Sequence, residues 1–168
     1  MEWTDMDPHI GTIIEVGCLV TDKNLNLLAE GPELVIHHSQ QALDKMSDWH
    51  QINFKQTGLI QAALDSTTSL DQAETQLLKF TQQYCESKTS PLCGNSVHMD
   101  RMFLAHHMPN LLDSFSHRII DVSTIKELYK YWYPSLPEYE KEKAHRALDD
   151  IKESVAELKY YRDKIFLP

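Results

Sequence analysis

The sequence has few cysteines, few basic residues and no long apolar run, and each shortage argues against a class of protein. Its three cysteines form no Cys-x-x-Cys pair, which predicts reduced thiols rather than a disulfide framework. No apolar stretch approaches the roughly 18 residues that a membrane helix needs. Only 16 Lys and Arg stand against 25 Asp and Glu, a net charge of −9. Such a balance argues against a tight, non-specific binder of long duplex nucleic acid.

The rest of the composition is that of an ordinary globular domain. The chain has 168 residues, of which 42% are hydrophobic, enough to bury a substantial core. We find no internal repeat, linker or low-complexity segment. The sequence therefore predicts one domain over residues 1–168.

Hydrophobic patterning predicts a mixed α/β fold. Residues 12–21 and 27–37 are rich in apolar and β-branched residues and predict a hairpin, with a bulge or edge at Gly31-Pro32. Helical patterns cover residues 69–84, 99–107, 123–131 and 147–164, and further strands are expected near 92–95 and 118–122. The strand–helix alternation of the second half predicts parallel strand pairs with helical crossovers, and hence a mixed sheet flanked by helices.

Three details of these helices are specific enough to test. Ser69 and Ser123 are the expected N-caps of their helices, because a serine hydroxyl accepts the free amide hydrogens of a first turn. The final helix is expected to bury an apolar stripe. Its members are Leu148, Ile151, Val155 and Leu158.

Acidic residues and one histidine gather in two short segments. His145–Asp150 reads His-Arg-Ala-Leu-Asp-Asp and precedes the final helix, and Gly94–Asp100 ends in an acid further upstream. Carboxylates from separate parts of a chain can hold Mg²⁺, and a nearby histidine can act as general base. Two such ions about 4 Å apart would clamp a phosphodiester, which points to a nuclease. Helical geometry alone does not choose between Asp149 and Asp150 as the ligand.

Several ordered motifs together resemble oligoribonuclease, the small 3′-to-5′ exoribonuclease family of the DEDDh exonuclease superfamily. They are Gly94–Asp100, Arg118–Thr124, Lys126–Leu128 and His145–Asp150, supported by Ile13–Asp22, Met46–Trp49 and Thr57–Leu59. The resemblance runs from Glu2 to about Phe166. It implies a ribonuclease H-like exonuclease fold, a mixed central sheet flanked by helices, whose first strand is truncated.

The resemblance also implies the catalytic residues. Glu2, Asp100 and Asp150 would be ligands of two Mg²⁺ or Mn²⁺ ions, and His145 the general base. The first motif of the family is Asp-x-Glu; Glu2 matches its glutamate, and the aspartate would precede Met1. Without that aspartate, weakened two-metal binding is expected.

Matching positions imply contacts with a very short RNA. Met6 would wedge beside a base and Trp49 would support base stacking. Ser96, Arg118, Ser123 and Thr124 would hold the terminal 5′ phosphate. His117 replaces an aromatic residue that the family offers across a dimer interface, and the resemblance implies that the protein is a homodimer. A capped 5′ phosphate would explain a preference for dinucleotides.

The sequence thus predicts a 3′-to-5′ exoribonuclease that degrades RNA dinucleotides and very short oligoribonucleotides to 5′-mononucleotides. The alternative is a non-catalytic relative that dimerises or binds oligonucleotides, motivated by the absent aspartate and by Asp5, Phe54 and His117 at positions where the family differs. A DNA-proofreading exonuclease is less favoured, because the phosphate-contact residues match the dinucleotide specialist. The resemblance implies the cytosol and, in animals, also mitochondria.

Overall fold

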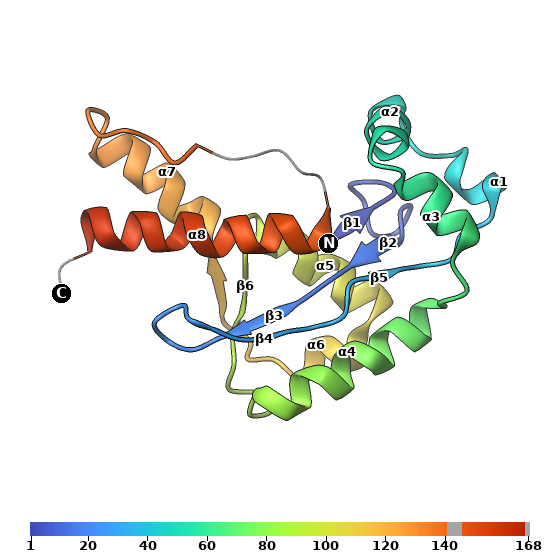
Figure 1. Ribbon diagram of the computed structural model, residues 1–168, viewed down its shortest axis with the longest axis horizontal. Coiled ribbons are helices and arrows are strands. Elements are labelled where there is room, and N and C mark those ends of the chain that lie inside the picture. The colour runs from blue at the N-terminus through green and yellow to red at the C-terminus, as the bar shows by residue number, and fades with distance from the viewer. Residues whose placement is uncertain (141–145, 167–168) are drawn as a thin grey trace.

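The computed structural model describes residues 1–140 and 146–166, and the fold in these ranges is mixed α/β (Figure 1). The strands are β1 (Glu2–Trp3), β2 (Ile13–Val16), β3 (Leu19–Thr21), β4 (Leu27–Glu30), β5 (Leu34–Val35), β6 (Leu92–Gly94) and β7 (Ile119–Asp121). The helices are α1 (Gln40–Leu43), α2 (Asp48–Gln56), α3 (Leu59–Asp65), α4 (Leu70–Tyr84), α5 (Val97–His107), α6 (Pro109–Asp113), α7 (Val122–Trp132) and α8 (Ala147–Ile165). None of these helices is long and apolar enough to cross a membrane.

The described strands form three small sheets instead of one continuous sheet. β1, β2 and β5 form an antiparallel sheet in the order β1-β2-β5, β3 pairs antiparallel with β4, and β6 pairs parallel with β7. The two long strands predicted in the first half are each divided. Next to the β3–β4 pair, the amide of Gly31 donates to the Cys18 carbonyl at 2.9 Å. A Cβ on Gly31 would lie only 2.7 Å from the Cys18 Sγ atom, so a larger residue here would require its neighbours to shift.

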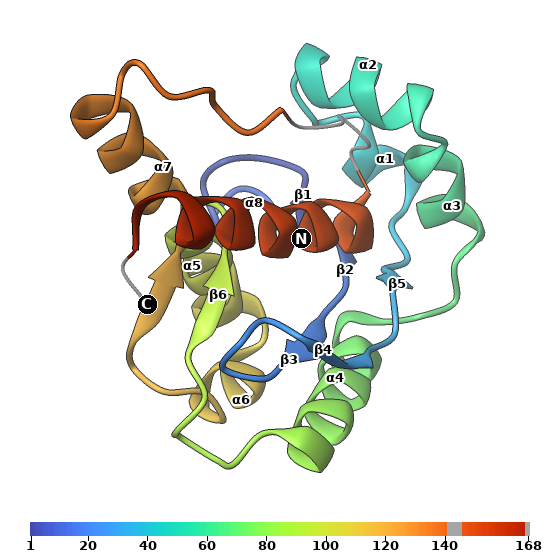
Figure 2. The ribbon, with the colours of Figure 1, turned by 60° about the vertical axis from the view of Figure 1, so that its left-hand side comes forward.

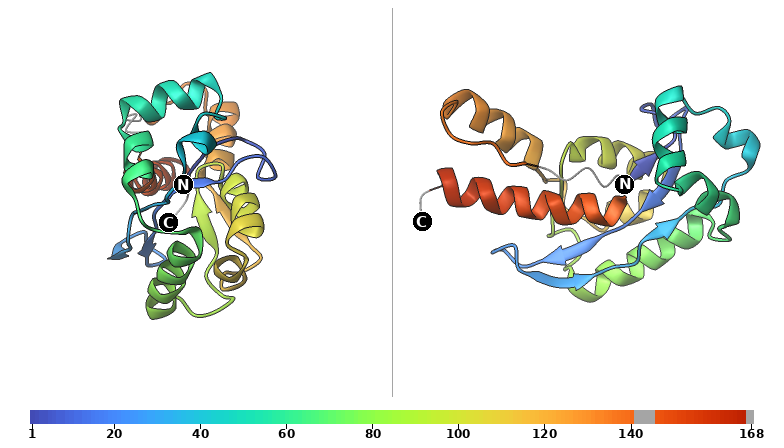
Figure 3. Two further views of the ribbon diagram at one scale, coloured as in Figure 1. Left: turned by 90° about the vertical axis from the view of Figure 1, so that its right-hand side faces the viewer. Right: turned by 45° about the horizontal axis from the view of Figure 1, so that its top comes forward.

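Strand β2 lies between two apolar clusters and is buried along its whole length. The first cluster joins Ile13 and Val16 of β2 to α4 and α5, and the second joins Ile14 to α1, α2 and α3. Helices α8 and α4 lie on opposite sides of strands β3 and β4 (Figure 3). Glu15, the charged residue of β2, lies in the interior and has no exposed surface.

The crossover predicted for the second half is confirmed. Strand β6 continues through α5 and α6 into the parallel strand β7, and α7 follows directly (Figure 2). The predicted cap of α4 is confirmed as well. The Ser69 hydroxyl accepts the Gln72 amide at 3.2 Å, while the Gln72 side chain accepts the Ser69 amide at 2.9 Å, a complete capping box.

Two predictions about the helices were wrong. The N-cap of α7 is Asp121, whose carboxylate accepts the amide of Ser123 at 3.0 Å; Ser123 lies inside the helix. The buried face of α8 is not the apolar stripe, whose members Leu148, Ile151, Val155 and Leu158 are only half-buried. Its buried positions are Ala147, Ser154, Glu157 and Tyr161. The polar members of that face find hydrogen-bond partners on other elements, which offset the cost of burying them.

Candidate active site

The three predicted metal ligands come together from three different elements. Glu2 lies on β1, Asp100 in the first turn of α5 and Asp150 in the first turn of α8. Burial raises the pKa of Glu2 to about 7; the Met1 ammonium opposes this rise, and the charges of Asp150, Glu15 and Asp100 add to it. Carboxylates that repel one another in this way are held close by the fold, which is the arrangement that a cation relieves.

The carboxylate of Asp100 gives the clearest indication that a cation would be stabilised among these acids. Its Oδ1 atom is buried and accepts no hydrogen bond within the described part of the chain. Burial raises the pKa of Asp100, and the ammonium of Met1, 4.0 Å from Oδ1, partly compensates. A hard divalent cation would satisfy such an oxygen better than an amine at that distance, so the residues fit a metal ion chemically.

The three acids do not form a finished ligand set. Over residues 1–140 and 146–166, no group of three or more His, Cys, Asp or Glu side chains is arranged to hold a metal ion. The two adjacent acids of α8 differ in their exposure to solvent. Asp149 is exposed, whereas Asp150 is half-buried and its charge acts on Glu2. Asp150 is therefore the acid that faces the site.

The N-terminus of α8 is hydrogen-bonded to residues in the first half of the chain. His145, the predicted base, lies outside the described residues, but its neighbour Arg146 places both Nε and Nη2 on the Glu15 Oε1 atom, at 2.9 and 2.7 Å. The other Glu15 oxygen accepts the Ala147 amide at 2.9 Å, and Glu33 accepts the Leu148 amide at 3.1 Å. Two carboxylates thus occupy the N-terminal amides of α8 and complement its dipole. The hydrogen bond to Glu15 is also the main cause that raises the pKa of Arg146.

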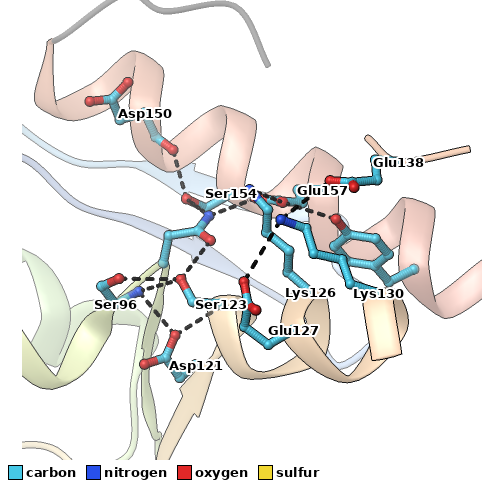
Figure 4. Close-up of polar contacts among 12 residues, drawn as sticks. Ser96, Asp121, Ser123, Lys126, Glu127, Lys130, Glu138, Asp150, Ser154 and Glu157 are labelled. Carbon is cyan, nitrogen blue, oxygen red and sulfur yellow. Dashed lines mark hydrogen bonds and ion pairs between the residues drawn. The ribbon is translucent and has the colours of Figure 1, made fainter. Parts of the chain in front are cut away.

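Two of the predicted phosphate contacts, Ser96 and Ser123, also come together, at the N-termini of α5 and α7 (Figure 4). Ser96 adopts a left-handed conformation with φ 50°, uncommon for a residue other than glycine. Its amide donates to both Asp121 Oδ1 and Ser123 Oγ at 2.9 Å, and the two serine hydroxyls lie 3.3 Å apart. Because Asp121 already fills the amides here, a phosphate at this place would contact the hydroxyl groups.

The other predicted substrate residues are dispersed over the surface. Met6, Trp49, Thr124, His117 and Arg118 are all exposed. Thr124 follows Ser123 in α7, while His117 and Arg118 precede β7. Arg118 stands three residues before Asp121, roughly 10 Å away along an extended chain, so its side chain would have to turn along β7 to reach the paired serines. The structure does not bring Arg118 or His117 into contact with them.

Met6 and Trp49 lie on neighbouring segments. Met6 is in the loop between β1 and β2, and Trp49 is in the first turn of α2 with 56% of its surface exposed. Next to them in sequence, Asp5 acts electrostatically on His50, whose pKa is lowered chiefly by burial. The indole of Trp49 contacts the His50 ring, with 5.1 Å between the ring centroids. Phe54, in contrast, is buried in the second core cluster.

Sequence reasoning missed the polar residues that hold these segments together. Glu15, Asn95 and Glu157 received no role, although each has partners on other elements. The signal for Glu15 was a lone acid in the apolar run Ile-Ile-Glu-Val, and Asn95 stood inside a motif quoted only as a pattern. Glu157 gave no signal, since a glutamate in a helix is ordinarily solvated.

Comparison with known proteins decides the family. A family model described as an exonuclease matches residues 1–158. A mitochondrial oligoribonuclease of Mus musculus is 48% identical over 168 residues, which cover 99% of this chain and 71% of the relative. An oligoribonuclease of Haemophilus influenzae (strain PittGG) is 47% identical over 164 residues, 97% of this chain and 90% of the relative. The chain belongs to the oligoribonuclease family.

Membership of the oligoribonuclease family makes this protein a 3′-to-5′ exoribonuclease, and the predicted fold class is confirmed. The exonuclease superfamily is generally dependent on divalent metal ions, in agreement with the carboxylates that face one another here. The matches do not favour the non-catalytic alternative.

Proposed function

We propose that this exoribonuclease hydrolyses RNA dinucleotides and very short oligoribonucleotides to 5′-mononucleotides, with two Mg²⁺ or Mn²⁺ ions in the site. The observation that carries the proposal is the meeting of Glu2, Asp100 and Asp150 beside the paired serines Ser96 and Ser123. The pKa values of Glu2 and Asp100 are raised, and the charge of Asp150 acts on Glu2. One buried oxygen of Asp100 has no hydrogen-bond partner in the described chain.

Each side chain has one task in this proposal. Glu2, Asp100 and Asp150 hold the ions, which when bound supply charge neutralisation and lower the pKa of water. His145 takes the proton of the attacking water, a role suited to a group whose pKa lies near neutrality. The hydroxyls of Ser96, Ser123 and Thr124 hold the 5′ phosphate, and Arg118 adds its charge if the side chain turns along β7.

Substrate length follows from the same arrangement. A site that holds the 5′ phosphate close to the metal ligands leaves room for few nucleotides, and Met6 and Trp49 would support the bases by apolar and stacking contacts. In the proposed homodimer, His117 would approach the phosphate of the partner's site. The exposed position of His117 supports this role. The names of the mammalian relatives, which describe them as mitochondrial, support a mitochondrial location.

The decisive experiment follows a 5′-labelled diribonucleotide incubated with the full chain and Mn²⁺ or Mg²⁺. Asp150→Asn should lower kcat/KM by about 100-fold or more, because a ligand that stabilises transition-state charge supplies several kcal/mol. The adjacent exposed acid supplies a matched control, and Asp149→Asn should leave the rate nearly unchanged. Equal losses in the two variants would contradict the assignment of Asp150.

A length series tests the substrate claim separately. The chain should process a diribonucleotide faster than a longer oligoribonucleotide of the same base composition. Ser123→Ala should reduce this difference, since it weakens the contact with the 5′ phosphate. Equal rates for short and long RNA would remove the dinucleotide preference and leave the exoribonuclease activity standing.

A further inference from the structure

One side chain, that of Asn95, links the two parts of the site. Asn95 lies between the end of β6 and Ser96. Its Nδ2 group donates to Ser154 Oγ and to Glu157 Oε2, both at 2.9 Å, and its Oδ1 atom accepts the Ser123 hydroxyl at 3.1 Å. Both amide hydrogens are thus used on α8 and the carbonyl on α7, which leaves this short side chain one orientation.

The contacts on α8 lead to the metal-facing acid. Ser154 donates its hydroxyl to the main-chain carbonyl of Asp150 at 2.7 Å, one turn earlier in the helix. The contacts on α7 lead to the paired serines, because the Ser123 hydroxyl that Asn95 accepts is also the acceptor of the Ser96 amide. A continuous chain of hydrogen bonds therefore runs from Ser96 to Asp150 (Figure 4).

A buried carboxylate, that of Glu157, joins this chain of hydrogen bonds at Asn95. Glu157 has no exposed surface; its Oε2 atom accepts from Asn95, while its Oε1 atom accepts the Tyr161 hydroxyl at 3.2 Å and lies 3.8 Å from Lys126 Nζ of α7. A buried carboxylate persists only where partners replace its lost hydration. These partners come from the loop before α5, from α7 and from α8 itself, so their satisfaction requires one relative position of the three helices.

We infer that Asn95 and Glu157 are positioning residues of the exonuclease reaction, which keep the helix that carries Asp150 in register with the helix N-termini that carry Ser96 and Ser123. The inference rests on the proposed function of those residues. Neither positioning residue touches the substrate in this role. Their effect is on the separation between the metal ligands and the phosphate contacts, and a misplacement of about 1 Å in such a site can cost about 100-fold in rate.

The test compares four single variants of the full chain on the diribonucleotide with saturating Mn²⁺. Asn95→Ala and Glu157→Ala should lower kcat by about 10- to 100-fold, with a smaller effect on KM, because geometry is lost and the contact groups remain. Glu157→Gln keeps the shape and an oxygen acceptor for Asn95, so it should restore most of kcat. Lys152→Ala removes a surface ion pair of α8 with Glu30 and should leave kcat unchanged.

Three kinetic results would overturn the inference. The first is full kcat in Asn95→Ala with only a lowered Tm, which would make Asn95 a packing residue. The second is an equal loss of kcat in Glu157→Gln and Glu157→Ala, which would assign the effect to charge. The double variant Asn95→Ala/Glu157→Ala should be no slower than the worse single variant, since one substitution already interrupts the chain of hydrogen bonds. A loss of kcat equal to the product of the two single losses would also contradict the inference.

Amide hydrogen exchange separates this inference from the proposed function. In the absence of substrate, Asn95→Ala should speed exchange at the first turns of both α7 and α8, because each loses its link to the other. Faster exchange confined to residues next to Asn95 would overturn the inference, whatever the activity. If the parent chain cleaves no short RNA, the proposed function fails, and the exchange result alone decides whether Asn95 couples the two helices.

Discussion

The two parts of the site differ in how completely their polar atoms are satisfied. Around Asn95 every side-chain donor and acceptor of that residue is used, and the carboxylate of Glu157 is met on both oxygens. Among the acids, Asp100 buries an oxygen with no hydrogen-bond partner in the described chain, and the pKa of Glu2 is raised to about 7. We therefore interpret the satisfied part as scaffold and the unsatisfied part as the place where a metal ion would bind.

The largest effect should come from neutralising the unsatisfied acid. Asp100→Asn should lower kcat/KM by about 1000-fold, because a metal ligand is lost. It should also raise Tm in metal-free buffer by about 2–4 °C, the equivalent of about 1 kcal/mol in a chain of this size. Stability and activity would then move in opposite directions. Asp113→Asn, at an exposed ion pair with Lys88, is the control and should change neither; a lower Tm for Asp100→Asn would contradict the comparison.

The raised pKa of Glu2 predicts an unusual dependence of stability on pH. The folded carboxyl keeps its proton up to about pH 7, whereas an unfolded glutamate loses it near its ordinary value of 4.5. The folded state therefore binds more protons in this window, and the free energy of unfolding should fall as pH rises from 4.5 to 7, by at most about 3 kcal/mol. Denaturant unfolding of metal-free protein measures this slope, and Glu2→Gln should flatten it. An unchanged slope in that variant would assign the effect to other groups.

Divalent ions should stabilise the protein through the acids alone. At about 100 times its dissociation constant, Mn²⁺ should add about 2.7 kcal/mol to the free energy of unfolding, and the gain should shrink below pH 7, where Glu2 is protonated. Thermal unfolding with and without Mn²⁺ measures it. Asp100→Asn should abolish the Mn²⁺-dependent rise in Tm, and Ser123→Ala should retain it. An equal rise in Asp100→Asn would place the ion elsewhere.

The smallest effect should come from the satisfied part, where stability and activity fall together. Ser123→Ala removes the acceptor of the Ser96 amide and the donor to Asn95, so Tm should drop by about 2–4 °C. Loss of one phosphate contact should lower kcat/KM by about tenfold, equal to about 1.4 kcal/mol. The exposed neighbour offers a control for stability, since Thr124→Ala should leave Tm unchanged. A higher Tm in Ser123→Ala would show that this part, too, carries strain.

Much of the local structure could be predicted because its causes are local. The capping box of α4 needs only Ser69 and Gln72, three residues apart, and the parallel pair β6–β7 follows from strand–helix alternation. The N-cap of α7 could not be chosen in this way, because Asp121 and Ser123 are both good caps. Tertiary contacts made the choice, since the Ser123 hydroxyl is taken by Ser96 and Asn95.

The buried face of α8 was mispredicted for a related reason. Apolar periodicity favoured the stripe through Leu148, yet that stripe is only half-buried while the charged Glu157 has no exposed surface. A helix normally buries its apolar side because polar groups lose water at a cost. That cost is offset when partners stand ready, and the partners of Glu157 come from 62 residues away at Asn95 and from Lys126 of another helix. No window of sequence contains them.

The sequence by itself indicated which residues are candidates for the chemistry: ordered acids, one histidine and two serines in motifs that identify the family. Only the tertiary structure decided how they are held. It brought Glu2, Asp100 and Asp150 close enough to repel, distinguished Asp150 from Asp149 by burial, and placed Asn95 in hydrogen bonds that join α8 to the paired serines. The sequence gives the type of each residue, whereas its burial and its hydrogen-bond partners depend on distant segments that meet only when the chain folds.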